Sequence, residues 1–437
     1  MTKLLRWASL HAILLTTTAS VAPAQTFTEL AYFNWTAGAY PVTALVQGID
    51  GNLYGGTGAG GLSGTGTVFK ISTGGVLTLV ADGPSGALVQ ATNGDLYGAT
   101  TSTIFKLTPS GITTTLASVR YANALLQGTD GNFYATNLTY PNGAVFKMTP
   151  AGVLTTLASF DSSPATEPVG RLVQATDGNF YGVTGGNVFE GGGTLFRITP
   201  DGVLTNLYGW PPYSDNFPQA GLVQAADGNL YGSTSGYGNC LEYGVCGSIF
   251  KITLDGVFTT VYRFHGYDGA NPVTALIQAT DGNLYGTTPT LQTAPNGGTL
   301  FRLTPEGVLT TLYTFPWNPE VGHEPSALFQ ATDGNLYGTT YGGGTSNYGE
   351  VYKYSLGLSP FVITVPVGGK AGRAVRILGT NLTGATSVTF NGVPATFEVV
   401  SPTQITTSVP IGATTGPVQV VGPNGTLASN VVFQVEP

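Results

Sequence analysis

The side chains best suited to chemistry are scarce in this sequence. Histidine occurs three times in 437 residues, and only His265 and His323 lie beyond the N-terminal segment. Two carboxyl groups at a defined separation would suit glycoside hydrolysis. The acidic residues between predicted strands that could supply such a pair are Asp215, Glu242, Asp268, Glu320, Glu324 and Glu350. Loop acids are more often simply solvated, so no catalytic residue is assigned.

Metal and cofactor chemistry find little support. His265 and His323 could form a paired metal site, but neither has further ligands at zinc spacing, and we favour no metal. The repeated Asp-Gly-Asn lacks the spacing of a calcium loop and is better explained as turn chemistry. No nucleophile elbow, phosphate loop or dinucleotide fingerprint stands out. We therefore expect no cofactor.

Cys240 and Cys246 are the two cysteines of the chain and flank five residues of a long insert. In an exported protein this spacing predicts a disulfide that shapes the loop. A redox pair is the weaker alternative, because Cys-x-x-Cys spacing is absent.

A six-residue motif, Asp-Gly-Asn-Leu-Tyr-Gly, organises most of the chain. Its seven copies, at intervals of 37 to 54 residues, are Asp50–Gly55, Asn93–Gly98, Asp130–Ala135, Asp177–Gly182, Asp227–Gly232, Asp281–Gly286 and Asp333–Gly338. A motif recurring at such a period indicates a repeat architecture.

Each repeat predicts four short strands, which describe a β-propeller blade. The Asp-Gly turn between the first two strands is expected to be a two-residue hairpin with positive φ at both central residues. Only six fourth strands follow the seven motifs, and residues 26–33 match the missing one. We therefore predict an all-β fold, with a closed seven-bladed propeller over residues 26–357. Its N-terminal strand would be the outer strand of the last blade.

Glutamine, tyrosine and a basic residue also recur in every repeat, as Gln47, Tyr54 and Lys70 do in the first. They could be rings of ligands. Because a residue present in every blade does a task common to every blade, we favour packing or bonding between neighbours.

The N-terminus resembles a secretory signal peptide over residues 1–24. Lys3 and Arg6 precede a short apolar stretch, and Ala22-Pro23-Ala24 suits cleavage near Ala24. The apolar run is too short and too rich in threonine to span a bilayer. Without Lys3 and Arg6, 13 basic residues face 23 acidic ones. A chain with this excess of acidic residues is poorly suited to bind phosphate groups, so we expect no nucleic-acid partner. We also expect no insertion into a membrane.

The repeats resemble the bacterial GloVer tandem-repeat family of extracellular proteins over about residues 26–357, and the strand order is similar to that of NHL-type propellers. The resemblance implies fold and location rather than an activity. From residue 358 to 437 the composition changes, and Leu378–Leu382, Val388–Ala395 and Val409–Gly416 resemble an IPT/TIG domain. That resemblance implies an immunoglobulin-like sandwich, here a spacer or adhesion module.

Variable loops on a rigid frame are where recognition usually resides. We therefore expect an exported binding or adhesion protein, either extracellular or periplasmic, whose ligand is a glycan or an extracellular protein. The alternatives are an exported enzyme of polysaccharide lyase or hydrolase type, and a purely structural surface protein. The candidate ligand-binding side chains, all in variable segments, are Trp35, Trp210, Tyr213, Tyr237, Tyr243, His265, Tyr267, Trp317, His323, Tyr341 and Tyr348. Packing between blades is an equally weighted explanation for many of them.

Overall fold

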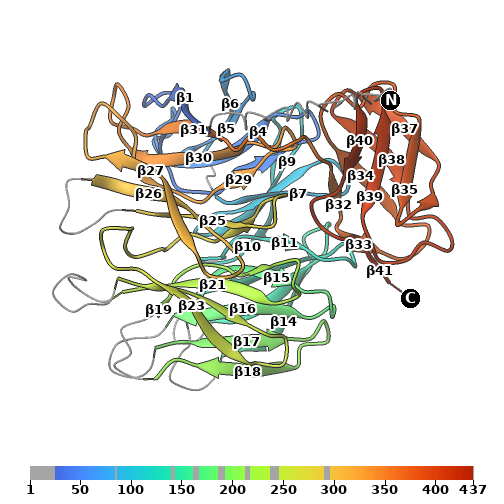
Figure 1. The fold of residues 1–437 in the computed structure, drawn as a ribbon, viewed down its shortest axis with the longest axis horizontal. Coiled ribbons are helices and arrows are strands. Elements are labelled where there is room, and N and C mark those ends of the chain that lie inside the picture. The colour runs from blue at the N-terminus through green and yellow to red at the C-terminus, as the bar shows by residue number, and fades with distance from the viewer. Residues whose placement is uncertain are drawn as a thin grey trace, which may run out of the picture.

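The computed structural model describes residues 25–83, 86–138, 143–160, 167–185, 192–211, 217–236, 246–289 and 296–436. The predicted signal peptide and Cys240 lie outside these ranges, so signal cleavage and the disulfide stay predictions. Within the ranges every regular element is a β-strand. Seven antiparallel sheets of four or five strands precede the C-terminal strands, and the prediction of an all-β fold is confirmed (Figure 1).

The seven sheets are numbered 1–7 by the motif that each contains. Sheet 1 comprises β2 (Ala39–Pro41), β3 (Val46–Gln47), β4 (Leu53–Ala59), β5 (Thr67–Ile71) and β6 (Leu77–Asp82). Sheet 2 comprises β7 (Leu88–Gln90), β8 (Leu96–Ala99), β9 (Thr103–Leu107) and β10 (Thr113–Ser118). Sheet 3 comprises β11 (Leu126–Gln127), β12 (Phe133–Asn137), β13 (Ala144–Met148) and β14 (Leu154–Ser159). Sheet 4 comprises β15 (Glu167–Gln174), β16 (Phe180–Gly185), β17 (Thr194–Ile198) and β18 (Leu204–Gly209).

Sheet 5 comprises β19 (Phe217–Pro218), β20 (Val223–Gln224), β21 (Leu230–Ser235), β22 (Ser248–Ile252) and β23 (Phe258–Arg263). Sheet 6 comprises β24 (Ile277–Gln278), β25 (Leu284–Thr288), β26 (Asn296–Leu303) and β27 (Leu309–Pro316). Sheet 7 comprises β28 (His323–Pro325), β29 (Phe329–Gln330), β30 (Leu336–Gly342), β31 (Glu350–Ser355) and the N-terminal β1 (Thr26–Tyr32).

The N-terminal strand completes sheet 7, as the sequence predicted. β1 pairs antiparallel with β31, from Thr26 opposite Ser355 to Tyr32 opposite Glu350. The ring of Phe27 stacks 3.9 Å from Tyr313 of sheet 6. β1 therefore contributes both strand pairing and apolar packing to sheet 7.

The short strands β2, β19 and β28 were not predicted. Each lies in the link that leads into its sheet and pairs with the far half of the second strand, as Ala39 does with Ala59. These links are indistinguishable from loops in the sequence, because two or three residues give no detectable period.

The motif turn differs from the predicted two-residue hairpin. In sheet 1 the amide of Gly51 donates to Gly48 O, and only the glycine has positive φ, at 80°. This is the three-residue loop in which a type I turn ends in a left-handed glycine. The Asp50 carboxylate stabilises it by accepting from the amide of Asn52 and the hydroxyl of Tyr54. The hydrogen bond of the motif tyrosine thus lies within its own sheet, and not between neighbours as one of the two predicted tasks would require.

The motif glutamine connects neighbouring sheets. In six of the seven described copies its side-chain Oε1 accepts from a backbone amide in the motif turn of the preceding sheet. Gln47 of sheet 1 reaches Thr332 of sheet 7, with a Thr332 N to Oε1 distance of 3.0 Å. Gln90 instead donates to carbonyl groups of its own turn.

The C-terminal strands form two four-stranded sheets and one two-stranded sheet around a separate core. The first comprises β32 (Ile363–Val365), β34 (Ala374–Leu378), β38 (Gln404–Ser408) and β37 (Phe397–Ser401). The second comprises β36 (Val393–Pro394), β35 (Ser387–Phe390), β39 (Val418–Gly422) and β40 (Gly425–Ala428). The third pairs β33 (Gly368–Gly369) with β41 (Gln434–Val435).

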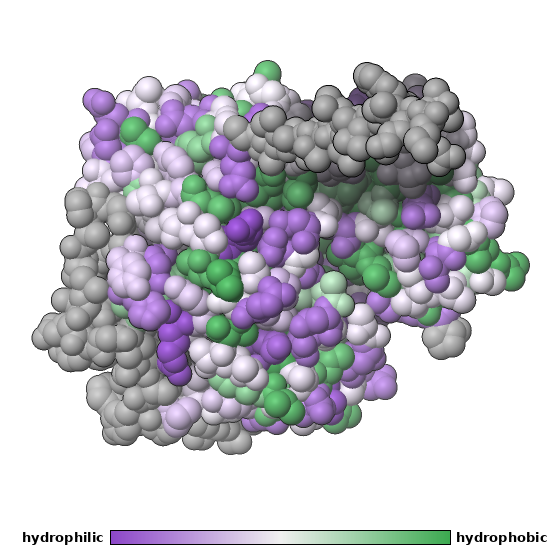
Figure 2. All heavy atoms as spheres, in the orientation of Figure 1, coloured by the Kyte–Doolittle hydropathy of each residue, from purple (hydrophilic) through white to green (hydrophobic). Residues whose placement is uncertain are grey.

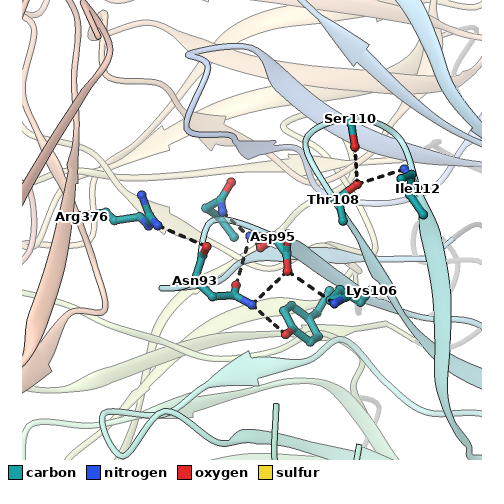
Figure 3. Close-up of polar contacts among 9 residues, drawn as sticks. Asn93, Asp95, Lys106, Thr108, Ser110, Ile112 and Arg376 are labelled. Atoms are coloured by element: carbon teal, nitrogen blue, oxygen red, sulfur yellow. Dashed lines mark hydrogen bonds and ion pairs between the residues drawn. The ribbon is translucent and has the colours of Figure 1, made fainter. Parts of the chain in front are cut away.

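This C-terminal unit contacts the motif turns directly (Figure 1). Arg376 donates from Nη2 to Asn93 O at 3.2 Å (Figure 3). It also donates from Nε to Thr92 O at 2.7 Å, so it holds the turn of sheet 2. Thr403 Oγ1 donates to Ile49 O, and the amide of Phe361 donates to Thr332 O. The C-terminal unit is therefore attached to the turns of sheets 1, 2 and 7.

Candidate functional site

The seven sheets have two distinct ends. The turn face carries the motif turns and the turns between third and fourth strands, and part of it is covered by the C-terminal unit. The loop face carries the connections between second and third strands and the links between sheets. Every exposed aromatic side chain of the described residues lies at the loop face, namely Tyr32, Trp35, Tyr121, Tyr267, Trp317 and Tyr341. Aromatic exposure therefore singles out the loop face.

Three of these exposed rings each lie against a half-buried aromatic ring. Trp35 contacts Tyr348 with 5.7 Å between ring centroids. Tyr341 stacks on Tyr40 at 4.9 Å and an interplanar angle of 23°. Trp317 contacts His323 at 4.9 Å. Trp35, Trp317 and Tyr341 are 45%, 55% and 44% exposed.

A fourth exposed ring belongs to a separate link, between sheets 5 and 6. Tyr267 is 83% exposed and stacks 5.7 Å from the ring of His265. The buried Asp268 accepts from the His265 amide at 2.8 Å and lies 3.1 Å from His265 Nδ1. Tyr262 also donates its hydroxyl to Asp268. Asp268 therefore holds the imidazole ring in one orientation.

Trp210 was expected to be a surface candidate, and this expectation is wrong. It is 6% exposed and its ring packs edge-on against Tyr208, Phe250 and Phe258. It occupies the last position of its fourth-strand pattern, where Phe33, Phe160, Phe264 and Phe315 are also buried. The packing explanation holds for Trp210.

The other candidates divide into described and undescribed residues. Tyr213, Tyr237 and Tyr243 lie outside the described residues, as do the acidic candidates Asp215 and Glu242. The structure brings together Trp35, Trp317, His323, Tyr341 and Tyr348 at one corner, and keeps His265 and Tyr267 apart in another link.

Glu350 is buried, although its place in the sequence predicted a solvated loop residue. Its carboxyl oxygens form no hydrogen bond of normal geometry, although the backbone of Gly322 lies against them. Burial, and next the negative charge of Glu29, raise the pKa of Glu350 to about 8. Corresponding positions in other sheets hold Thr67, Thr194, Ser248 and Thr299, each bonded to a threonine across the pair. Aligning the repeats would have marked Glu350 as the exception.

Tyr121 was also missed. It is exposed on the link after sheet 2 and follows the buried Val119 by two residues. Trp35 follows Phe33, and Trp317 follows Phe315, at the same spacing. That spacing was the available signal, but valine in place of the usual aromatic residue hid it.

Charge around the corner is one-sided. The sequence has no lysine or arginine between Arg302 and Lys353, and none between Gln25 and Phe69. Glu320 and Glu324 lie in the link beside Trp317. In the part of the chain that the structure describes, no group of three metal-ligating side chains occurs.

A cavity of about 220 Å³ lies at the turn face. Its lining includes Asn93, Gln127, Asp130 and Arg373. Motif residues and the C-terminal unit therefore enclose it together. On the side seen in Figure 2, hydrophilic and hydrophobic residues are interspersed, without one broad apolar area.

The comparisons with known proteins agree with this architecture. The sequence profile of the Gloeobacter/Verrucomicrobia repeat matches residues 101–290 and 218–393. The IPT/TIG domain profile matches residues 362–435. No curated protein matches the chain.

Two solved structures from B. thetaiotaomicron share the fold. One is the extracellular domain of a hybrid two-component system, with TM-score 0.52 and 12% identity, and the match covers 94% of this chain and 58% of that one. The other is the extracellular domain of a one-component system, with TM-score 0.52 and 15% identity, covering 92% and 52%. This chain thus spans little more than half the length of either. No helix in the described residues is long and apolar enough to cross a membrane.

Proposed function

This chain belongs to the Gloeobacter/Verrucomicrobia repeat family and ends in an IPT/TIG domain, and on that premise we propose that it is an exported binding protein. Its seven sheets would be the blades of one closed propeller, and its loop face would bind a glycan or an extracellular protein. Export would follow cleavage of the predicted signal peptide near Ala24.

Closure of the ring is supported by contacts between the first and last sheets. Gln47 of sheet 1 bonds to Thr332 of sheet 7 as other motif glutamines bond to their preceding sheets. Each such hydrogen bond contributes about 1 kcal/mol to stability. In a closed ring of this kind only short, protected sheet edges remain exposed to other chains.

The observation that carries the binding proposal is the one-sided distribution of exposed aromatic side chains. All six in the described residues lie at the loop face, while the C-terminal unit covers part of the turn face. Tyrosine and tryptophan dominate binding energy at recognition surfaces, because they bury a large area with few rotatable bonds. The extracellular context of the two structural relatives is consistent with this proposal.

Site-directed immobilisation tests which face binds. Ser63→Cys lies in the loop-face insert of sheet 1, and Ser110→Cys lies in a turn of sheet 2 at the other face; both serines are exposed. Protein attached through either cysteine is probed with arrays of glycans and extracellular proteins, with the parent chain as background. We expect binding when attachment is through residue 110 and its loss when attachment is through residue 63. The reverse pattern would reject the loop face.

A hydrolase is the second candidate, favoured by the contact of Asp268 with His265. A carboxylate that orients an imidazole through Nδ1 is a common arrangement for a general base. The His265 side chain remains 56% exposed, so a substrate could reach it. Release of reducing ends from polysaccharides that stops in a His265→Asn variant would support hydrolysis. Equal release by parent and variant, or none, would count against it.

A further inference from the structure

We propose that Trp35, Tyr341 and Trp317 form a stacking platform for a neutral polysaccharide chain, at the corner where sheets 6, 7 and 1 meet. The platform rests on the proposed function, since it names the ligand class and the binding residues at the loop face. Each ring comes from a different segment: Trp35 from the link before β2, Tyr341 from β30, and Trp317 from the link after β27.

Two of the three rings belong to one aromatic layer, and the third is connected to it through the pairing of β28 with β30. Tyr40 contacts Tyr341 at 4.9 Å and Tyr348 at 5.8 Å, and Tyr348 contacts Trp35 at 5.7 Å. The Tyr40 amide also donates to Tyr348 O at 2.9 Å. On the other side, His323 beneath Trp317 pairs with Gly342, the neighbour of Tyr341. Trp35 and Tyr341 therefore belong to one connected group of rings, and Trp317 with His323 forms a second group on the opposite side of the end of β30.

The inner rings hold the outer ones in place before any ligand binds. Tyr40 has a φ of 58°, a left-handed conformation that is uncommon for a bulky residue and unusual before a proline. It is enforced by the pairing of its neighbours, Ala39 with Ala59 and Pro41 with Thr57. Such strain persists only where the surrounding structure over-determines it. Rings that are already ordered lose little conformational entropy on binding.

The charges select a neutral ligand. The platform segments carry no lysine or arginine, while Glu320 and Glu324 follow Trp317 closely in the chain. Their negative potential disfavours a polyanion. A pyranose ring can place its C–H face on an aromatic ring while its hydroxyl groups remain solvated or bond to nearby carboxylates and backbone groups. Hot spots at interfaces between proteins are enriched in arginine as well as in tryptophan and tyrosine, and this corner has no arginine.

Affinity electrophoresis of residues 25–437 tests the platform, with mixed-linkage β-glucan, xylan, galactomannan and amylose as neutral probes and alginate as the anionic probe. We expect at least one neutral probe to retard the parent protein, and alginate to leave its mobility unchanged. Trp35→Ala, Tyr341→Ala and Trp317→Ala should each weaken binding about tenfold, and the triple variant should abolish it. Trp35→Phe and Trp317→Phe should retain most of the affinity. Val153→Ala, an exposed turn-face change, should retain all of it.

The contrary outcomes separate the platform from the proposed function. A triple variant that binds a neutral probe like the parent overturns the platform but leaves loop-face binding intact. If Tyr121→Ala or Tyr267→Ala alone abolishes binding, the ligand binds elsewhere on the loop face, and the platform is also overturned. If only alginate retards the parent protein, or if no probe retards it, the proposed ligand class is wrong. Melting temperatures of all variants show that they fold, and the phenylalanine variants serve where an alanine variant does not.

Discussion

Replacing Glu350 with glutamine should stabilise the protein increasingly as the pH rises. The carboxyl group is buried, and its pKa is raised to about 8 from the usual 4.5. Between these values the folded protein keeps a proton that the unfolded chain has lost. The free energy of unfolding therefore falls as the pH rises through this window, by about 1.4 kcal/mol per pH unit. From pH 4.5 to 7 the loss attributable to Glu350 is about 3 kcal/mol.

Glutamine has a similar shape and no charge, so this pH-dependent loss disappears in Glu350→Gln. Urea unfolding of parent and variant at pH 4.5, 6 and 7 measures the difference at each pH, and other titrating groups cancel between the two proteins. We expect the difference to grow by about 3 kcal/mol in favour of the variant. Glu350→Thr, which copies the threonine of sheets 1, 4 and 6, should behave in the same way. A difference that stays constant with pH would refute the argument, because Glu350 would then titrate normally in the folded protein.

Three further predictions concern the frame and its export. Deleting residues 26–33 should lower the free energy of unfolding by about 4 to 8 kcal/mol, since it exposes the surfaces that Phe27, Leu30 and Phe33 cover; an unchanged melting temperature would show that β1 is dispensable. Arg376→Ala should speed proteolysis between residues 356 and 361 and lower the free energy of unfolding by about 1 to 3 kcal/mol. Lys370→Ala, a change at an exposed residue, should do neither. Equal effects of the two variants would reject the Arg376 contact as the attachment. Exported protein should begin at or near Gln25 and lose about two hydrogens in intact mass through a Cys240–Cys246 disulfide; free thiols or an intact Met1 would contradict these expectations.

The frame was predictable because its signals are local and repeated seven times. The motif turn has a left-handed glycine, and the motif tyrosine bonds to the aspartate or asparagine four residues earlier, so each copy indicates a hairpin at the same place. The pairing of β1 with β31 followed from counting fourth strands, although the two lie at opposite ends of the repeats. The short strands of the links carry no such repeated signal and were missed.

The candidate site was predictable only in part, because residue type does not reveal exposure. Trp210 and Trp317 looked equivalent, yet Trp210 replaces the buried terminal aromatic residue and Trp317 follows one by two positions. The attachment of the C-terminal unit was not predictable either. Arg376 binds the backbone carbonyl groups of Thr92 and Asn93, and any sequence could present those.

Oxidation of tryptophan by N-bromosuccinimide, with and without a bound neutral polysaccharide, tests most directly whether the loop face is the binding surface. Residues 25–437 contain three tryptophans, of which Trp35 and Trp317 are exposed and Trp210 is buried. Peptide mass spectrometry follows each residue separately, and Trp210 serves as the internal standard. We expect saturating polysaccharide to slow oxidation at both Trp35 and Trp317 and to leave Trp210 unreactive throughout. Unchanged oxidation of Trp35 and Trp317, while electrophoresis shows the polysaccharide bound, would contradict it.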